Sequence, residues 1–236
     1  MCTTLEHVFE RDKAFLERMF DCGVRSAAPG YRLAMTSTLR ALVLACSLKP
    51  SPQESSSEAI GRDVLGALAE HDVTGELIRV VDHGVSFGVT TDEGEGDGWP
   101  PLRQKMLNAD ILVIATPIWL GQASSVCKMV LERLDAELGE TDDEGRKITF
   151  GKVAAVAVVG NEDGAHHVTA QCLQALNDVG FSVAANGSTY WVGEAMQAVD
   201  YTDHDEKPEK TVQTTEVLAA NTAHLARLLK GANYPA

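Results

Sequence analysis

The chain lacks the features that mark several classes of protein. Its five cysteines, at positions 2, 22, 46, 127 and 172, form neither a C-x-x-C pair nor a metal-ligand spacing, which argues against a metal centre, an iron–sulfur cluster and a disulfide framework. No apolar run reaches the roughly 18 residues that a membrane helix needs. The first residues show neither the basic region nor the apolar stretch of a secretory signal. We therefore expect a cytoplasmic protein with no membrane partner.

Basic residues are also scarce. The 20 lysines and arginines are outnumbered by 34 aspartates and glutamates, so the net charge is 20 − 34 = −14. Nucleic acids and anionic membranes both need a basic surface, and this balance argues against either as a partner. It still allows one locally positive pocket for a phosphate group.

The length and the apolar pattern predict a single α/β domain with extensions. Apolar segments predict strands at 39–46, 76–82, 111–116, 153–159 and 181–185, and helical periodicity predicts helices at 58–71, 101–108, 124–138, 165–179 and 211–230. A further amphipathic helix at 4–21 predicts an N-terminal helical extension over 1–38, before a domain at 39–236. Strands that are apolar throughout and alternate with helices indicate a doubly wound parallel sheet in three layers. In such a sheet, ligands bind at the carboxyl ends of the strands.

The loop after the first predicted strand is the most informative segment. The apolar run ends at Cys46, and Ser47, Lys49 and a serine triplet, Ser55 to Ser57, lead into the helix that begins near Glu58. A helix N-terminus presents free N–H groups and the positive end of the helix dipole, and serine hydroxyls can donate to phosphate oxygens. This pattern predicts an anion site.

The loops after the third and fourth predicted strands are unusual as well. The first of them, residues 116–128, places an aromatic side chain, Trp119, between Pro117 and Gly121. A loop of this kind can lay peptide groups and an indole against a flat heteroaromatic ligand. The second, residues 159–167, contains two glycines that permit close backbone approach. Each loop alone is also compatible with an ordinary turn.

Together, the three loops resemble those of the NADPH-dependent FMN reductase branch of the flavodoxin-like superfamily. The family's first loop has a G-S-x-R-x-x-S-x-[ST]-like pattern, to which Cys46 to Lys49 and the serine triplet are similar after a short insertion, with Cys for Gly and Lys for Arg. Its middle loop reads [ST]-P-x-[YW]-x-G-x-x-[ST]-x-x-x-K and is often followed by an L-D-R-like segment. The matching residues here are Thr116, Pro117, Trp119, Gly121, Ser124 and Lys128, with Leu131-Glu132-Arg133 as the tail. The resemblance covers about residues 39–190.

This resemblance implies a flavodoxin-like fold with a five-stranded parallel sheet, FMN as cofactor and NAD(P)H as electron donor. It implies that the FMN phosphate is held by Ser47, Lys49, Ser55 and Ser56, with Ser57 as a substitute for Ser55. It further implies that Pro117, Ile118, Trp119, Leu120 and Gly121 border the ribityl chain and the ring, and that Gly160, Asn161 and Gly164 approach the ring from the fourth strand. In similar proteins a partner subunit often closes the flavin site, so we expect a homodimer.

Three classes of function stay open at this point. The leading one is an oxidoreductase that takes hydride from NAD(P)H and passes electrons to a flavin, a quinone or a similar acceptor. The others are a flavodoxin-like electron carrier and a flavin-free scaffold or regulatory protein. We assign no catalytic side chain, because the cofactor carries the chemistry; for His166, His167, Lys128 and Cys46 we prefer structural roles. The acidic runs at 92–97 and 200–206 are interpreted as solvated loops.

Overall fold

The computed structural model of the protein describes residues 38–195 and 197–236. The predicted helix at 4–21 lies outside these residues. The described elements are β1 (Leu39–Ala45), α2 (Ser56–Ala69), β2 (Val73–Arg79), η1 (Val80–His83), α3 (Trp99–Asn108), β3 (Ile111–Trp119), β4 (Gln122–Ala123), α4 (Ser125–Leu134), η2 (Asp135–Leu138), β5 (Val153–Gly160), α5 (Ala165–Asp178), β6 (Ser182–Val192), η3 (Tyr201–Asp203) and α6 (Glu209–Gly231). Within the described part of the chain, none of the helices is both long enough and apolar enough to span a bilayer.

Five strands form a parallel sheet in the order β2-β1-β3-β5-β6, and the short β4 pairs antiparallel with the end of β3. The chain moves from β1 outward to β2 and then returns to build β3, β5 and β6 on the other side. The loops after β1 and β3 therefore diverge at one switch point, where ligands bind in sheets of this kind. The predicted flavodoxin-like, doubly wound fold with five parallel strands is confirmed.

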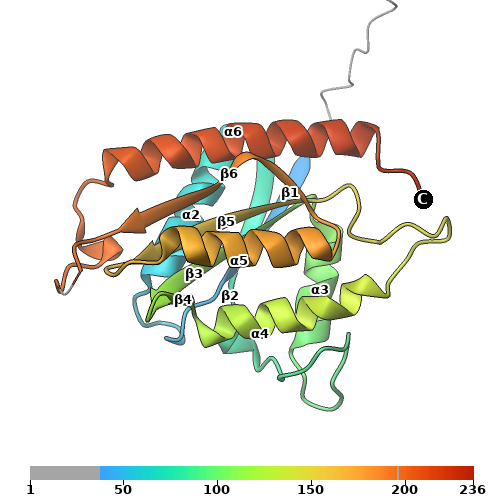
Figure 1. Cartoon of the computed structure of the whole chain (residues 1–236), viewed down its shortest axis with the longest axis horizontal. Coiled ribbons are helices and arrows are strands. Elements are labelled where there is room, and N and C mark those ends of the chain that lie inside the picture. The colour runs from blue at the N-terminus through green and yellow to red at the C-terminus, as the bar shows by residue number, and fades with distance from the viewer. Residues whose placement is uncertain (1–37, 196) are drawn as a thin grey trace, which may run out of the picture. The chain divides into compact units, whose positions relative to one another are not determined.

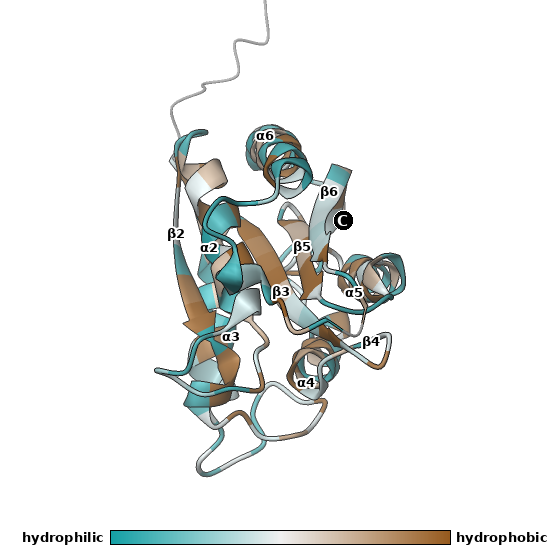
Figure 2. Cartoon of the chain, turned by 90° about the vertical axis from the view of Figure 1, so that its left-hand side faces the viewer, coloured by the Kyte–Doolittle hydropathy of each residue, from teal (hydrophilic) through white to brown (hydrophobic). Residues whose placement is uncertain are grey.

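Helices cover both faces of this sheet (Figure 1), with α2 and α6 on one face and α3, α4 and α5 on the other. Side chains of β1 alternate between the two layers: Leu42 and Leu44 join the core under α3 to α5, while Ala41 and Val43 join the core under α2 and α6. Figure 2 shows the apolar strands enclosed between helices whose outer sides are hydrophilic. Burial on both faces explains why these strands are apolar at consecutive positions.

Among the predicted strands, those at 76–82 and 181–185 differ most from the structure. β2 begins at Val73 and ends at Arg79, and the residues after it form a 3-10 turn instead of continuing the strand. β6 is more than twice its predicted length, because a register shift against β5, between Ala154 and Val156, lets the strand resume after an interruption. Tyr190 and Trp191, predicted in a loop, therefore lie on a strand beside the end of β5.

The acidic segment after η1, predicted to be a flexible loop, is held by a buried ion pair. Arg133 of α4 donates to the carbonyl oxygens of Ser86 and Thr90, both at 2.9 Å, and contacts the Asp97 carboxylate at 2.8 Å. The side chains of Arg133 and Asp97 are only 0% and 1% exposed. The interpretation of residues 92–97 as a solvated run is wrong at Asp97, because a buried guanidinium attracts this carboxylate inward.

Candidate functional site

The first loop starts directly at the end of β1. The backbone N–H of Cys46 still donates to the carbonyl of Ala115 on β3, at 2.8 Å. The next residue, Ser47, is buried, and its hydroxyl accepts a hydrogen bond from the N–H of Lys49 at 3.0 Å and lies 3.2 Å from the Lys49 carbonyl. A serine that bonds its own backbone two residues on makes a tight turn. The chain therefore leaves the sheet at the switch point between β1 and β3.

The loop ends at the N-terminus of α2. Ser55 is the N-cap residue, and its hydroxyl accepts from the N–H of Glu58 at 3.3 Å and lies 3.1 Å from the hydroxyl of Ser57. Ser55 and Ser57 are buried, and Ser56 is half-buried. Their side chains and the first N–H groups of the helix therefore gather where an anion is favoured by the helix dipole.

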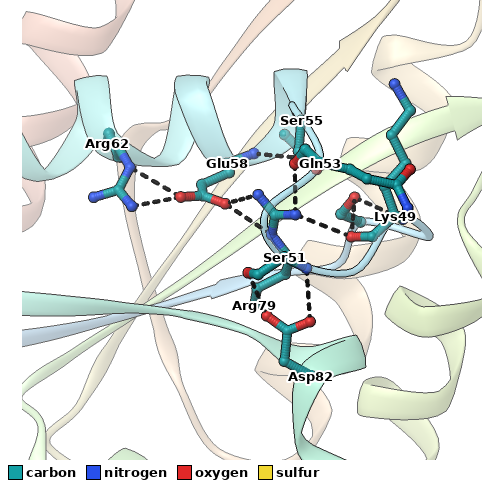
Figure 3. A network of polar contacts seen from close by, with 10 residues as sticks. Lys49, Ser51, Gln53, Ser55, Glu58, Arg62, Arg79 and Asp82 are labelled. Atoms are coloured by element: carbon teal, nitrogen blue, oxygen red, sulfur yellow. Dashed lines mark hydrogen bonds and ion pairs between the residues drawn. The ribbon is translucent and has the colours of Figure 1, made fainter.

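Arg79, the last residue of β2, supports the loop after β1 through hydrogen bonds to its backbone (Figure 3). Its guanidinium donates to the carbonyl oxygens of Lys49 at 3.2 Å and Gln53 at 2.7 Å, and it binds the Glu58 carboxylate through Nε at 2.8 Å and through Nη2. Partial burial of Glu58 acts to raise the pKa of its carboxyl, but hydrogen bonds from Arg79 and Arg62 outweigh this effect, and the pKa lies below its usual value. Glu58 is therefore ionised at neutral pH and committed to these two arginines.

A second contact fixes the loop from η1. The Asp82 carboxylate accepts hydrogen bonds from the Ser51 N–H at 2.9 Å and the Ser51 hydroxyl at 2.6 Å (Figure 3). These bonds lower the pKa of Asp82. The inserted residues 50–52 are thus anchored to η1, the 3-10 turn that follows β2, so the insertion does not leave the loop unsupported.

The second loop is a β-hairpin. β3 continues to Trp119 and turns through Leu120 and Gly121, both with positive φ of 52° and 72°, into β4. Ser124 then caps α4 by accepting from the N–H of Cys127 at 3.1 Å, and its hydroxyl donates to the Cys46 carbonyl at 2.7 Å. The hairpin is in this way tied to the start of the first loop.

The third loop requires its glycines for close packing. A Cβ built on Gly160 would lie 2.9 Å from the Ile118 side chain, and one built on Gly164 would lie 2.9 Å from the backbone of Gly121. Gly164 also has a φ of 126°, which disfavours any other residue. Asn161 donates from its amide to the Gln197 carbonyl at 3.0 Å, which holds the segment after β6 against this loop.

These three loops surround one cavity at the carboxyl ends of the strands. Ten of the thirteen residues predicted to bind the cofactor line it: Ser47, Lys49, Ser55, Ser56, Ser57, Pro117, Ile118, Trp119, Gly160 and Asn161. The other three do not. Leu120 is 92% exposed at the tip of the hairpin, whereas Gly121 and Gly164 line an adjacent hollow of about 530 Å³ with His166, His167 and Tyr190. The prediction that Leu120, Gly121 and Gly164 border the flavin therefore stays a prediction, since Leu120 and Gly121 form the hairpin turn and Gly164 is the N-cap residue of α5 beside the hollow.

Four further residues line the cavity and were not predicted. Leu48 and Val159 are neighbours of predicted residues, and Trp191 is brought there by the extension of β6 along β5. Asp200 comes from the acidic segment that was interpreted as solvated. Nothing in the local sequence distinguishes Asp200 from the acidic residues that follow it, so only the tertiary structure identifies it.

We preferred structural roles for Cys46, Lys128, His166 and His167, and the structure shows what surrounds each of them. Cys46 is fully buried, and its hydrogen bond to Cys127, together with burial, raises the pKa of its thiol well above the ordinary value, so it is not a nucleophile at neutral pH. Lys128 pairs with Glu132 one turn along α4 at 3.1 Å, rather than with a neighbouring loop. His167 contacts Gln122 at 3.1 Å, and the His166 ring meets Tyr190 edge-on at 5.2 Å, both beside the hollow.

The residues around the cavity fit the phosphate end of FMN. They offer four serine hydroxyls, the first N–H groups of α2 and the Lys49 ammonium, which makes no ion pair with any residue in the described ranges. The cavity measures about 100 Å³, below the roughly 300–1,000 Å³ of pockets that enclose a whole small molecule. It can thus enclose one end of such a ligand, while Trp119, 53% exposed, offers a flat face at its mouth.

Comparison with known proteins supports the family that the three loops resemble. Residues 39–197 match the family model described as NADPH-dependent FMN reductase. A relative from Streptomyces davaonensis, the 8-demethyl-8-aminoriboflavin-5'-phosphate synthase, is 34% identical over 206 residues, which are 83% of this chain and 80% of the relative. A relative from Mycobacterium bovis, named divalent metal cation transporter MntH, is 35% identical over 81% of this chain, but the chain spans only 29% of its length.

Solved structures give the same result. The crystal structure of RosB with bound 8-demethyl-8-formylriboflavin-5'-phosphate has a TM-score of 0.74 and 34% identity, and the match covers 83% of this chain and 82% of RosB. A flavone reductase, at 18% identity and a TM-score of 0.60 over 83% of this chain and 66% of its own, supports the fold alone. Because the family model matches residues 39–197 and a relative is 34% identical over 83% of this chain, the chain belongs to the NADPH-dependent FMN reductase family and is a flavin-dependent oxidoreductase.

Proposed function

We propose that the protein binds FMN at this cavity and uses it to transfer electrons from NAD(P)H to a small acceptor such as a flavin or a quinone. When bound in this cavity, FMN would supply the redox chemistry between the nicotinamide and the acceptor, and the residues around the cavity would hold its phosphate and border its ring. The observation that carries the proposal is the convergence of ten predicted cofactor residues around one cavity at the switch point of the sheet.

Each part of the chain has a separate role in this proposal. Ser47, the serines of residues 55–57 and Lys49 hold the phosphate through hydrogen bonds and charge. Pro117, Ile118 and Trp119 border the ribityl chain and one edge of the ring, and Gly160 with Asn161 limits the opposite side. In FMN enzymes of this kind the side chains position the ligand and exclude water, whereas the redox step belongs to the cofactor.

The second substrate fits the hollow beside the cavity. Its lining includes His166, His167 and Tyr190, and its volume of about 530 Å³ lies within the range of small-molecule sites. Two substrates that use this hollow in turn would exclude each other, so steady-state kinetics should follow a ping-pong scheme. Arg103 and Lys105, two basic residues that could otherwise meet the extra phosphate of NADPH, pair with Glu137 and Glu76. Lys49 lines the cavity and is assigned to the FMN phosphate, so a modest preference for NADPH rests on the family resemblance.

A second candidate function is chemical modification of the flavin itself, and one observation favours it. The Streptomyces relative is a synthase of an aminoriboflavin phosphate, and the similar RosB structure carries a flavin phosphate described as an intermediate. Both candidates need the same phosphate site. They differ in whether the flavin leaves the protein unchanged.

Two measurements separate these functions. The purified protein, loaded with FMN and kept free of oxygen, is mixed with NADH or NADPH, and flavin absorbance is followed by stopped flow. Bleaching by either nicotinamide, and recovery on addition of quinones or free flavins, supports the reductase. Bleaching only after a separate reductase is added supports the electron carrier, and failure to bind FMN supports the scaffold. Incubation of FMN with the protein in air, followed by mass spectrometry of the extracted flavin, reveals any modified product.

The homodimer, the cytoplasmic location and the domain boundary near residue 38 stay predictions. The flavin site of a single chain is open at Trp119 and Leu120, which are 53% and 92% exposed, and a partner subunit would cover such apolar surface. Light scattering of the purified protein tests the dimer. A monomer that still binds FMN and oxidises NAD(P)H would contradict it.

A further inference from the structure

The N-terminus of α2 has the sequence of a capping box but not its bonds. In that motif, Ser at the N-cap accepts from the N–H three residues on, and Glu at that position accepts in return from the N-cap N–H. Ser55 makes the first bond, with the Glu58 N–H at 3.3 Å. The Glu58 carboxylate does not return the second, because its Oε1 is bound by Arg62 and its Oε2 by Arg79 (Figure 3).

The open box leaves hydrogen-bond donors free at the cavity. Within residues 38–195 and 197–236, the backbone N–H groups of Ser55, Ser56 and Ser57 have no acceptor. The same three residues line the cavity. A closed box would satisfy the Ser55 N–H internally and would bring a carboxylate to the place where the helix dipole favours an anion.

Arg79 is held in a position from which it keeps the Glu58 carboxylate away from the Ser55 N–H. Its side chain is 8% exposed, whereas the Arg62 side chain is 65% exposed. Besides Glu58, Arg79 binds the carbonyl oxygens of Lys49 and Gln53, so its position is set by three separate partners. It draws one carboxylate and two carbonyl oxygens of the loop toward itself, and these are the groups that would repel a phosphate.

We propose that Arg79 is a positioning residue that holds Glu58 away from the N-terminus of α2 and so keeps its N–H groups open to the phosphate of FMN. This inference rests on the proposed flavin site. Without Arg79, Glu58 closes the capping box and competes with the ligand phosphate for the same donors. The effect should be specific for ligands that carry a phosphate, because the phosphate is the group that the N–H donors of α2 would hold in the proposed site.

The test compares FMN with riboflavin, which lacks the phosphate, by titration of flavin fluorescence on the full chain. Arg79→Gln should raise the Kd for FMN at least about tenfold, whereas the Kd for riboflavin should change less than about threefold. The double variant Glu58→Gln with Arg79→Gln should recover most of the FMN affinity, because the neutral amide is a weaker competitor for these donors. Arg62→Gln is the matched control and should leave both constants unchanged. Circular dichroism verifies that each variant folds.

Each outcome decides between this role and simpler ones. Equal loss of FMN and riboflavin in Arg79→Gln, or no recovery in the double variant, would show that Arg79 only supports the fold of the loop, and would overturn the proposal. If Arg79→Gln does not fold, Arg79→Lys retains the charge but cannot bind Glu58 and both carbonyls together, and it should show the same selective loss. An unaltered protein that binds riboflavin as well as FMN would refute the phosphate site while leaving a flavin site, and one that binds neither flavin would refute the proposed function itself.

Discussion

Two loops of this protein are each organised by one arginine, and they differ in what the arginine leaves free. Arg133 binds two carbonyl oxygens of the loop after η1 and the Asp97 carboxylate, and Arg79 binds two carbonyl oxygens of the loop after β1 and the Glu58 carboxylate. Both guanidiniums thus collect the same three kinds of acceptor. In the loop after η1, the Asp97 carboxylate also accepts hydrogen bonds from the N–H groups of residues 86, 93 and 99.

The two loops differ in whether their own backbone N–H groups have acceptors within the protein. Around Arg133, the backbone N–H groups of residues 86, 93 and 99 donate to Asp97, so these donors are used within the loop. Around Arg79, the Glu58 side chain accepts from Arg62 and Arg79, and the N–H groups of residues 55–57, which line the cavity, have no acceptor within the described ranges. The loop after η1 therefore uses these donors to stabilise the fold, whereas the loop after β1 leaves donors available for a ligand.

The largest expected effect is on the loop after η1. Arg133→Met should lower the free energy of unfolding by about 3–5 kcal/mol, because it leaves the buried Asp97 carboxylate without its partner. Denaturant unfolding measures this change. The double variant Arg133→Met with Asp97→Asn should regain part of the loss, because no unpaired charge remains. FMN affinity should be almost unchanged in both; a large loss of FMN affinity would show that the two loops are not independent.

The second prediction addresses the loop after β1. Ser55→Ala combined with Ser56→Ala should raise the Kd for FMN at least about tenfold, because hydrogen bonds to a charged group contribute about 1.5–3 kcal/mol each. The structure sharpens this expectation: Ser55 is also the N-cap of α2, so its loss should lower stability by about 1 kcal/mol. Ser56→Ala alone should weaken binding without that loss. Unchanged affinity in a fluorescence titration would place the phosphate elsewhere.

The sequence predicts the fold and the positions of these loops, but not the arginines that hold them. Apolar runs at consecutive positions and a serine-rich loop before a helix are local patterns, and they identify β1, α2 and most of the residues around the cavity. Arg79 and Arg133 resemble ordinary surface charges in the sequence, because their partners lie 21 and 47 positions away. The extension of β6 was missed for a similar reason, since pairing with β5 determines it rather than its own residues.

The third prediction concerns acid. Burial of the Asp97 carboxyl tends to raise its pKa, but the hydrogen bonds from Arg133 and three backbone N–H groups hold it well below its ordinary value of 3.8. A carboxyl with a lowered pKa stabilises the fold above its ordinary pKa, and this contribution is lost as the pH falls through the lowered value. The unfolding free energy should therefore drop below about pH 4. The double variant at positions 97 and 133 should show a smaller drop, and equal pH profiles for both proteins would contradict this assignment.

The smallest effect is expected at Arg62, the other arginine that binds Glu58. Its side chain is 65% exposed and pairs one turn along α2, and such pairs contribute about 0.5 kcal/mol or less. Arg62→Gln should therefore shift the denaturation midpoint only slightly, and less still in high salt, because salt screens exposed charges. Arg62 and Arg79 carry the same charge near the same carboxylate, so this variant separates charge from position. If Arg62→Gln weakened FMN binding as strongly as Arg79→Gln, the positive charge near α2 would matter more than the hydrogen bonds of Arg79 to the loop. The difference between the loop after β1 and the loop after η1 would then no longer depend on Arg79.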